Sequence, residues 1–599
     1  MTSFKELNSY FKKYKGTIAI GTLILIAANF FLVWIPIFVS RTMDQVAEIK
    51  QTSPGHFDSL IDVLTSPKVG WMLAQNSLML IGVVLLYGIL LFATRQTLIV
   101  TSRKIEYDLR NDVFTKLLKL SQPFYDKRQS GDIYVRATED ISKVREYFGP
   151  AYMYTFNTIS RMGFIVTAML LVSPELTIWA LIPLPILSLY AYWVSRYINE
   201  YSRIIQEQYS NIAERAQESF SSIRLIKAFN RQDYEQQQFE AESESFRKKK
   251  LKLAAVESLF HPTLNFLIGV SVIIVIWKAG TMVMAGTLTV GNIVEFVVWV
   301  AYLTWPVASL GFTVNRFQQA MASWKRIDDV LKQKVDISDT TKTNNKIETI
   351  EGKIEFKNVS FKYPGSELYA LKNLSFTIEA GQNAAIVGRT GSGKTTIVQL
   401  LPRLYNTTEG QIFIDGMNIN EIPLDVLRSE IGLVPQDTFL FSNSIGENIA
   451  FGTLNASQRQ IERAAEKAQV RENILQFDKK FETILGERGI TLSGGQKQRT
   501  AIARALIRDP KIIVLDDSLS AVDTKTEEAI LQHLRNELKG RTTVMISHRI
   551  STIKDADIIF YIENGTIAEM GTHQELLNKK GHYENMYSKQ LIEDELAEI

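Results

Sequence analysis

A glycine-rich octapeptide carries the first candidate chemistry of this chain. Residues 388–395 read GRTGSGKT, which fits the G-x-x-x-x-G-K-[ST] pattern of a phosphate-binding loop. Backbone N–H groups in such a loop, together with the N-terminus of the helix that follows, donate hydrogen bonds to phosphate oxygens. Lys394 is expected to reach the β- and γ-phosphates, and the Thr395 hydroxyl is expected to bind Mg²⁺. The candidate nucleotide-binding residues of the loop are Gly388, Arg389, Thr390, Gly391, Ser392, Gly393, Lys394, Thr395 and Thr396.

The elements around this loop are the ones that must position it. Ala384–Val387 is a short apolar run that predicts a buried strand leading into the loop, and a helix is expected over Thr395–Leu401. This strand–loop–helix context is what makes the motif credible. Upstream, 353–363 alternates toward a strand pair and 371–378 predicts a further strand.

A second glycine-containing string lies about a hundred residues downstream, where 492–496 read LSGGQ. A helix is expected to begin near Gln496, so Ser493 and the glycine N–H groups lie just before a helix N-terminus. Backbone donors and the helix dipole favour an anion at such a position. The candidate ligand-binding residues here are Ser493, Gly495 and Gln496.

The two strings in this order, with six long apolar segments before them, resemble the ATP-binding cassette (ABC) transporters, as an exporter-type half-transporter. The resemblance covers five further elements in order over the second half of the chain. It implies that Tyr363 stacks on adenine, that Gln436 touches Mg²⁺ and water, and that Asp516 at the end of IIVLD holds Mg²⁺. It also implies that His548 in MISHR contacts the γ-phosphate and that 483–489 communicates with the membrane half.

The resemblance also implies a dimer. In the family, the LSGGQ segment covers the γ-phosphate held by the opposing subunit, so two ATP molecules lie between two ATPase domains. This chain has one such domain, and the cofactors implied are ATP and Mg²⁺. The catalytic candidates are Lys394, Gln436, Asp517 and His548, and the metal ligands are Thr395, Gln436 and Asp516.

Asp517 departs from the family pattern, which usually has glutamate after the Walker B aspartate to orient the attacking water. Aspartate keeps the charge but is one methylene shorter, and a carboxylate displaced by roughly 1 Å can cost about 100-fold in rate. The substitution resembles one subunit of heterodimeric exporters with one weak and one competent site. A heterodimer with a second half-transporter is therefore favoured, and a homodimer in which Asp517 works remains the alternative.

The first half of the chain is organised by long apolar runs. A transmembrane helix needs roughly 20 apolar residues, and these runs lack the alternation of membrane strands. We expect six spans, at about 17–40, 69–100, 147–174, 175–196, 258–280 and 290–315. Arg161 and Glu295 are ionisable groups at or near membrane depth, which favours a cavity or a functional pairing. Glu295 lies near an outer helix end, where contact with interfacial water is the alternative.

Basic residues predict the orientation of these spans. The connections 101–148 and 196–258 carry ten and eleven Lys and Arg residues, whereas the alternating loops 41–70, 173–175 and 278–288 carry four together. Both termini and the ATPase half are therefore expected in the cytosol, with the chain a multi-pass protein of the cytoplasmic membrane.

The two basic connections have helical spacing and would extend roughly 25–40 Å beyond the membrane at 1.5 Å per residue. Residues 123–125, followed by Gly131, Asp132, Arg136 and Asp140, resemble the first coupling-helix region of ABC exporters, and 214–229 resembles the second. Ordinary solvated helical hairpins are the alternative.

Length and composition set the outer bounds. The chain has 599 residues, so several domains are expected: a transmembrane domain over 1–330, a linker over 331–350 and an α/β P-loop ATPase domain over 351–590. The net charge of +3 gives no sign of a nucleic-acid partner, and the absence of cysteine excludes disulfides. ATP-driven export or flipping of a hydrophobic or amphipathic substrate among membrane lipids is the function predicted, and a nucleotide-gated channel or regulator is the alternative.

Overall fold

The computed structural model describes residues 2–52, 67–486, 489, 492–518, 532–534 and 537–598. Glu487 and Arg488 of the predicted segment 483–489 lie outside the described residues. The chain divides into two compact units: residues 1–118 with 131–333, and residues 119–130 with 334–599. The short segment 119–130, from the middle of the helical half, thus belongs to the unit that holds the strands.

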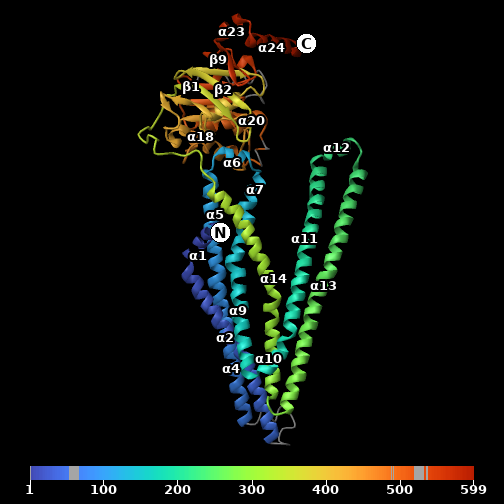
Figure 1. Ribbon diagram of the computed structural model, residues 1–599. Coiled ribbons are helices and arrows are strands. Elements are labelled where there is room, and N and C mark those ends of the chain that lie inside the picture. Colours follow the sequence, from blue (N-terminus) through green and yellow to red (C-terminus); the bar gives the residue numbers. More distant parts are fainter. Residues whose placement is uncertain are drawn as a thin grey trace. The chain divides into compact units, whose positions relative to one another are not determined.

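The described elements of the first unit are helices, most of them long (Figure 1). Thr289 caps α14 through a reciprocal capping box with Asn292, which satisfies donors that the helix start would otherwise leave free. The principal helices are α1 (Thr2–Lys13), α2 (Lys15–Thr52), α4 (Pro67–Thr94), α5 (Val100–Lys119), α9 (Tyr152–Val172), α10 (Pro174–Leu181), α11 (Pro183–Ser221), α12 (Ile223–Ala228), α13 (Gln232–Met284) and α14 (Val290–Lys332).

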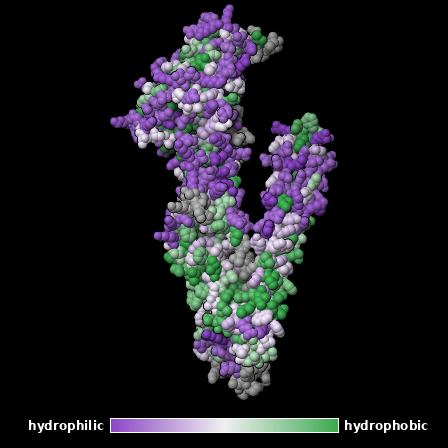
Figure 2. Space-filling view, viewed as in Figure 1, coloured by the Kyte–Doolittle hydropathy of each residue, from purple (hydrophilic) through white to green (hydrophobic). Residues whose placement is uncertain are grey.

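The length and the apolar composition of these helices identify the parts that could cross a membrane. Among the described residues, five helical segments are long and apolar enough to span a membrane, and a shorter apolar stretch, Val290–Pro306, lies at the predicted sixth span. Figure 2 shows hydrophobic side chains around α10 and the adjoining parts of the helices, whereas the arms of α11 and α13 that lead to α12 are mainly polar. The helical fold predicted for this half is confirmed.

Shorter helical segments lie between α4 and α9. The π-helical turn Arg95–Ile99 joins α4 to α5. Between α5 and α9 lie α7 (Ser130–Val135), α8 (Ile141–Glu146) and two further π-helical turns, Arg136–Asp140 and Tyr147–Ala151. The Asp140 carboxylate at the end of one such turn is fully buried and accepts hydrogen bonds from the Arg326 guanidinium of α14, with Nε at 2.8 Å from Oδ2. A buried carboxylate requires such a partner, so this pair fixes α14 against the α7–α8 segment.

Two sheets build the second unit. Antiparallel β1 (Ile354–Lys362), β2 (Tyr369–Ile378) and β4 (Glu409–Ile414) form a four-stranded sheet with β5 (Met417–Asn418). The larger sheet has the order β10-β9-β3-β8-β7-β6, and its five strands from β9 to β6 run parallel. These strands are β3 (Asn383–Gly388), β6 (Ile431–Val434), β7 (Ile512–Asp516), β8 (Thr542–Ile546), β9 (Ile558–Glu563) and β10 (Thr566–Gly571).

The parallel strands consist mainly of apolar residues, as expected for a sheet that helices cover on its faces. The helices of this unit are α6 (Gln122–Asp126), α15 (Lys394–Leu400), α16 (Leu424–Ser429), α17 (Ile445–Ala450), α18 (Gln458–Lys467), α19 (Arg471–Leu475), α20 (Gly494–Leu506), α22 (Ile550–Ile553), α23 (His573–Lys579) and α24 (His582–Glu598).

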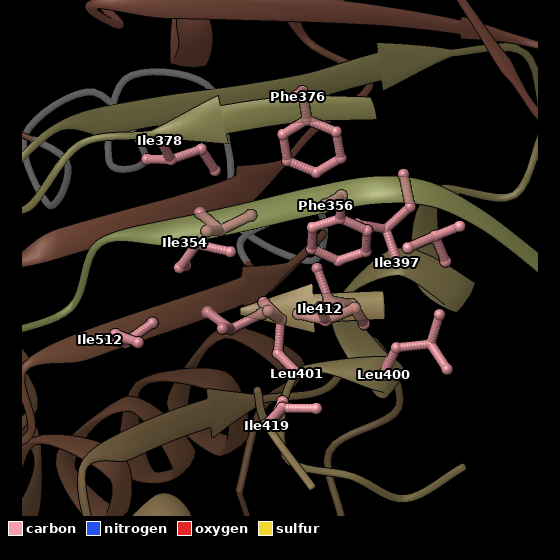
Figure 3. Close-up of a cluster of buried hydrophobic side chains, with 14 of the residues drawn as sticks. Ile354, Phe356, Phe376, Ile378, Ile397, Leu400, Leu401, Ile412, Ile419 and Ile512 are labelled. Carbon is pink, nitrogen blue, oxygen red and sulfur yellow. The ribbon is translucent and has the colours of Figure 1, made fainter. Parts of the chain in front are cut away.

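A buried apolar core lies between the two sheets and α15. Phe356 of β1 stacks on Phe376 of β2 with ring centroids 4.5 Å apart. Ile397 and Leu400 of α15 point into the same cluster (Figure 3). This core fixes the start of α15, and therefore the loop that precedes it, against the sheet.

Three local expectations need correction. Residues 353–363 form one strand, β1, rather than a strand pair, since its partner β2 comes from 369–378. Helix α20 begins at Gly494, two residues before the expected start, because the Ser493 side chain already caps it. Glu295 does not lie at an accessible position: its side chain is 3% exposed and Asn292 donates to it at 3.2 Å.

Candidate nucleotide-binding site

The site lies at the carboxyl ends of four neighbouring parallel strands, β3, β8, β7 and β6. The loop 388–393 follows β3, Asp516 ends β7, and His548 and Gln436 come just after β8 and β6. Because parallel strands end at one edge of a sheet, segments far apart in the sequence meet there. This edge is where open α/β sheets bind ligands.

Glycine is required at two positions of the loop. Gly388 has φ of +145°, and a Cβ there would lie 2.1 Å from the Ile562 carbonyl oxygen. Gly393 has φ of +105°, and its Cβ would lie 2.6 Å from the Ala370 carbonyl oxygen. A side chain at either position would push the loop off the sheet, so both glycines hold the loop in its phosphate-binding path.

Lys394 folds back over this loop. Its Nζ donates hydrogen bonds to the carbonyl oxygens of Gly388 and Arg389, each at 2.9 Å, and the residue is only 6% exposed. Burial lowers the pKa of the Lys394 ammonium, while the carboxylates of Asp516 and Asp517 oppose that shift. The cation is therefore held at the centre of the loop with little water around it, where it interacts strongly with an anion.

Ser392 supplies an independent indication of a ligand. Its hydroxyl is buried, and within the described residues it has no hydrogen-bond partner. A buried polar group without a partner is costly, and a phosphate oxygen in the loop would satisfy it. Arg389, Thr390 and Gly391 are exposed at the tip of the loop. The donor set of the loop thus fits the triphosphate of ATP.

Two oxygens beside the loop fit Mg²⁺. The Thr395 hydroxyl donates to Asp516 Oδ1 at 3.3 Å, and Mg²⁺ is commonly bound by one or two protein oxygens together with phosphate oxygens. Asp516 is 4% exposed, and burial raises the pKa of its carboxyl, with a further contribution from the Asp517 charge. A cation at this position would relieve both effects.

The predicted catalytic residues Asp517, Gln436 and His548 lie near one another beside the loop. Asp517 has φ of +46°, and its N–H donates to the Ile546 carbonyl oxygen at 3.0 Å, which fixes its backbone beside β8. Gln436 Nε2 donates to Asp517 Oδ2 at 3.4 Å. Burial, and secondly the Lys394 charge, lower the pKa of His548, so its imidazole is neutral at physiological pH. The structure therefore brings the predicted catalytic residues to one place.

Tyr363 belongs to an aromatic cluster next to α15. Its hydroxyl lies 3.0 Å from Thr396 Oγ1 and donates to Gln399 Oε1 at 3.2 Å. Its ring meets Tyr405 edge to face, with centroids 5.5 Å apart. The predicted adenine-binding aromatic thus adjoins the phosphate-binding helix.

Tyr405 and Asp126 are contacts that the sequence did not indicate. The Tyr405 hydroxyl donates to Asp126 Oδ2 at 2.6 Å, joining the second unit's sheet domain to α6 across 279 residues of sequence. Burial and the Asp126 carboxylate raise the pKa of Tyr405, so the hydroxyl remains a donor. A further bond, from the Ile337 N–H to Ser121 Oγ at 3.1 Å, holds the start of the same helix.

The LSGGQ residues form a separate helix start. Ser493 Oγ accepts from the Gln496 N–H at 3.3 Å, and the Ser493 N–H donates to Gln496 Oε1 at 3.0 Å. In the part of the chain that the structure describes, no hydrogen bond joins Ser493, Gly495 or Gln496 to the loop 388–395. Their predicted role toward the nucleotide of an opposing subunit stays a prediction.

Asp516→Asn is expected to abolish Mg²⁺-dependent ATP hydrolysis and to raise the thermal midpoint of the nucleotide-free protein by about 2–4 °C. The folded-state pKa of Asp516 is raised, so its ionised form is disfavoured in the fold. That penalty is absent at acidic pH and grows as pH rises above the ordinary aspartate value. Scanning calorimetry at acidic and neutral pH tests this, and a variant less stable than the wild type at neutral pH contradicts it.

Fold and site together define a membrane-embedded P-loop ATPase. The family described as "ABC transporter transmembrane region" matches residues 18–307, and the family described as "ABC transporter" matches residues 371–520. The chain belongs to the ABC transporter family, as an exporter-type half-transporter.

Several curated proteins match nearly the whole chain. It is 35% identical over 593 residues to the probable multidrug resistance ABC transporter ATP-binding/permease protein YheI of Bacillus subtilis (strain 168), covering 98% of this chain and 97% of that protein. It is 33% identical to the multidrug resistance-like ATP-binding protein MdlA of Escherichia coli (strain K12), covering 99% and 97%. It is 34% identical to the ATP-dependent lipid A-core flippase of Aromatoleum aromaticum, covering 82% and 80%.

A solved structure, a bacterial Atm1-family ABC exporter with ATP bound, matches with a TM-score of 0.75 and 25% identity, covering 97% of this chain and 99% of that one. The ABC ATPase domain supports ATP binding and hydrolysis coupled to transport.

Proposed function

We propose that this chain exports or flips an amphipathic substrate across the cytoplasmic membrane, using ATP, as one half of a dimeric transporter. The observation that carries the proposal is the assembly of Lys394, Asp516, Asp517 and His548 at one sheet edge, in a chain that also has membrane-spanning helices. Relatives named as multidrug transporters and as a lipid A-core flippase support an amphipathic substrate. The basic connections 101–148 and 196–258 support a cytosolic ATPase domain and cytosolic termini.

Each site residue has a role in this proposal. The loop 388–396 binds the triphosphate, Lys394 neutralises charge that develops on the γ-phosphate, and Tyr363 stacks on adenine. Thr395, Asp516 and Gln436 would hold Mg²⁺, which supplies charge neutralisation between the phosphates when bound. Asp517 orients the attacking water, and neutral His548 donates toward the γ-phosphate.

Closure of a dimer completes the site. Ser493, Gly495 and Gln496 of one subunit would cover the nucleotide on the loop of the other, since within one chain they make no hydrogen bond to that loop among the described residues. A nucleotide bound between two subunits favours the closed arrangement by its differential affinity for it. Hydrolysis removes that preference and resets the transporter. The short Asp517 favours a heterodimer, in which a second half-transporter supplies the stronger catalytic carboxylate.

Coupling between the ATPase and the membrane half is proposed to use α6. Tyr405 contacts the adenine-binding Tyr363 on one side and the Asp126 carboxylate of α6 on the other. A change in the position of Tyr363 on nucleotide binding would therefore reach α6 through Tyr405.

Tyr405→Phe is expected to reduce substrate stimulation of ATP hydrolysis by about tenfold while changing nucleotide affinity little. The phenylalanine ring keeps the aromatic packing but loses a buried hydrogen bond to a carboxylate, which is worth about 1.5–3 kcal/mol. Hydrolysis rates with and without substrate measure the ratio. Tyr369→Phe, which loses a bond to Glu409 at 2.9 Å on the exposed surface, is the matched control. Equal losses in both variants would exclude a coupling role for Tyr405.

Two measurements distinguish a transporter from a nucleotide-gated channel: ATP hydrolysis by the chain in lipid nanodiscs and ionic current in planar bilayers. A transporter hydrolyses ATP faster when amphipathic substrate is present and gives no ionic current. An ATP-gated channel gives a current that opens on nucleotide binding and needs no substrate. Current without substrate-stimulated hydrolysis would overturn the proposed function.

A further inference from the structure

A polar cluster lies inside the membrane-spanning helices. Asn29 of α2 is 1% exposed, and its Nδ2 donates to Asn157 Oδ1 at 2.9 Å and to Ser160 Oγ at 2.7 Å on α9. The remaining oxygen of Asn29 accepts from Arg161 Nε at 3.3 Å. Both N–H groups of this buried amide and one lone pair of its oxygen are therefore used, which holds α2 against α9 and orients Arg161.

Arg161 lies at membrane depth. From Arg161 to Val172, where α9 ends at the outer loop, the helix rises about 17 Å at 1.5 Å per residue. Since the hydrocarbon core is about 30 Å thick, the guanidinium lies near its middle, too deep for the side chain to reach an interface readily. A charge at this depth costs about 2.5–3.5 kcal/mol on insertion scales and is found where it has a function.

The charge of Arg161 has no acidic partner among the residues that the structure describes. Its described hydrogen bonds go to neutral groups: Nε to Asn29 and Nη2 to the Tyr87 hydroxyl of α4 at 3.3 Å. A guanidinium has five N–H donors in a planar fork. Three of them remain for a ligand, and this fork matches carboxylate, phosphate and sulfonate oxygens with two parallel bonds.

Aromatic side chains lie on the same helix as Arg161 and on the neighbouring helix α2. Phe164, one turn after Arg161 on α9, meets Phe30 of α2 edge to face with centroids 5.8 Å apart. Phe30 in turn contacts Trp34 at 6.1 Å. An apolar group of a ligand could therefore lie on these rings while its head group reaches Arg161.

We infer that Arg161, held by Asn29 and Tyr87, is the recognition point for the anionic head group of an amphipathic substrate whose apolar part contacts the neighbouring aromatic residues. This inference rests on the proposed function and specifies its substrate class. The same head-group chemistry occurs on free anionic amphiphiles and on anionic lipids, and both would use the same guanidinium.

Charge-matched probes test this assignment. The full-length wild-type chain in phosphatidylcholine nanodiscs, without nucleotide, is titrated with two dansyl-labelled dodecyl amphiphiles that end in a sulfonate or a trimethylammonium group. Fluorescence anisotropy should give at least about tenfold tighter binding of the sulfonate, as expected for a charge-assisted bidentate contact. Equal affinities, or a preference for the cation, would overturn the inference whether or not any variant folds.

Variants then locate the preference. Arg161→Gln should remove it, Arg161→Lys should keep part of it, and Tyr87→Phe should weaken sulfonate binding about two- to fivefold through the lost hydrogen bond. Lys278→Gln, which removes a cation paired with Glu175 at 2.7 Å, is the control and should leave the preference unchanged. A preference that survives in folded Arg161→Gln, or that Lys278→Gln also removes, contradicts the assignment.

Two further arms separate the remaining possibilities. Competition by labelled phosphatidylglycerol but not by phosphatidylcholine identifies a lipid head group as the source, and absence of competition identifies a free amphiphile; both agree with the assigned chemistry. Charge-selective binding, with no ATP-driven movement of either probe by the chain together with any subunit that copurifies, supports the inference while contradicting the proposed function. ATP-driven movement of the probes without charge-selective binding supports the proposed function and contradicts the inference about Arg161.

Discussion

Asp517→Glu is expected to raise ATP hydrolysis by the isolated chain about 100-fold, because the carboxylate that orients the attacking water would gain the missing methylene. The backbone at this position cannot compensate, since the Asp517 N–H is bonded to the Ile546 carbonyl oxygen of β8. The side chain is further occupied by the Gln436 amide at 3.4 Å. The measurement is steady-state phosphate release in lipid nanodiscs.

The controls for this gain distinguish chemistry from binding. Nucleotide affinity should change little, because Asp517 lies beyond the phosphate-binding loop, whereas Asp517→Asn should have no more activity than the wild type. A wild-type chain that already turns over rapidly and gains nothing from glutamate would show a self-sufficient homodimer. That result would contradict the heterodimer proposed above.

Lys394→Ala is expected to reduce hydrolysis at least about 100-fold, in the range found when one preorganised charge-stabilising group is removed. The residue is 6% exposed and its ammonium is held by two carbonyl oxygens of the loop, so the substitution removes a preorganised buried charge. Because burial lowers the pKa of Lys394 in the nucleotide-free protein, binding of the triphosphate should restore it and take up a proton.

Calorimetry of ATP binding in buffers of different ionisation enthalpy measures that proton uptake. The wild type should take up protons at alkaline pH, where the lowered pKa leaves part of the Lys394 amine neutral before ATP binds, and Lys394→Ala should not. Lys579→Ala, which removes an exposed ammonium that donates to the Met570 carbonyl oxygen at 2.9 Å, serves as the control. Full activity in Lys394→Ala would mean that the loop does not bind the nucleotide that is hydrolysed.

The sequence was sufficient for the phosphate-binding loop because its chemistry is local. Gly388 and Gly393 act through their backbone conformation, and Lys394 acts through a contact with its own loop. All three residues lie within one stretch of eight. The apolar runs likewise predicted the membrane-spanning helices, since bilayer thickness dictates their length. The strand that ends at Asp516 was predictable for a similar reason: a buried parallel strand is a nearly continuous apolar run, here Ile512 to Leu515.

Contacts between segments that are distant in the sequence could not be predicted from sequence patterns. The Tyr405–Asp126 bond joins a loop after α15 to a short helix from the membrane half, and neither residue type nor spacing marks it. The partner of β1 was misassigned because alternation reports exposure and not which strand lies alongside. Arg161 could be recognised as an unusual charge, but Asn29 and Tyr87, which hold it, come from two other helices.

Transport itself is the most direct test of the proposed export function. Inside-out vesicles that contain this chain, with any subunit that copurifies, are loaded externally with the dansyl-labelled sulfonate or trimethylammonium amphiphile, and lumenal accumulation is followed by fluorescence after ATP is added. The proposal predicts ATP-dependent accumulation of at least one probe, lost in a Lys394→Ala, Asp516→Asn double variant. No accumulation of either probe, with an ionic current that appears on ATP binding, would show that the chain is a gated channel and not an exporter.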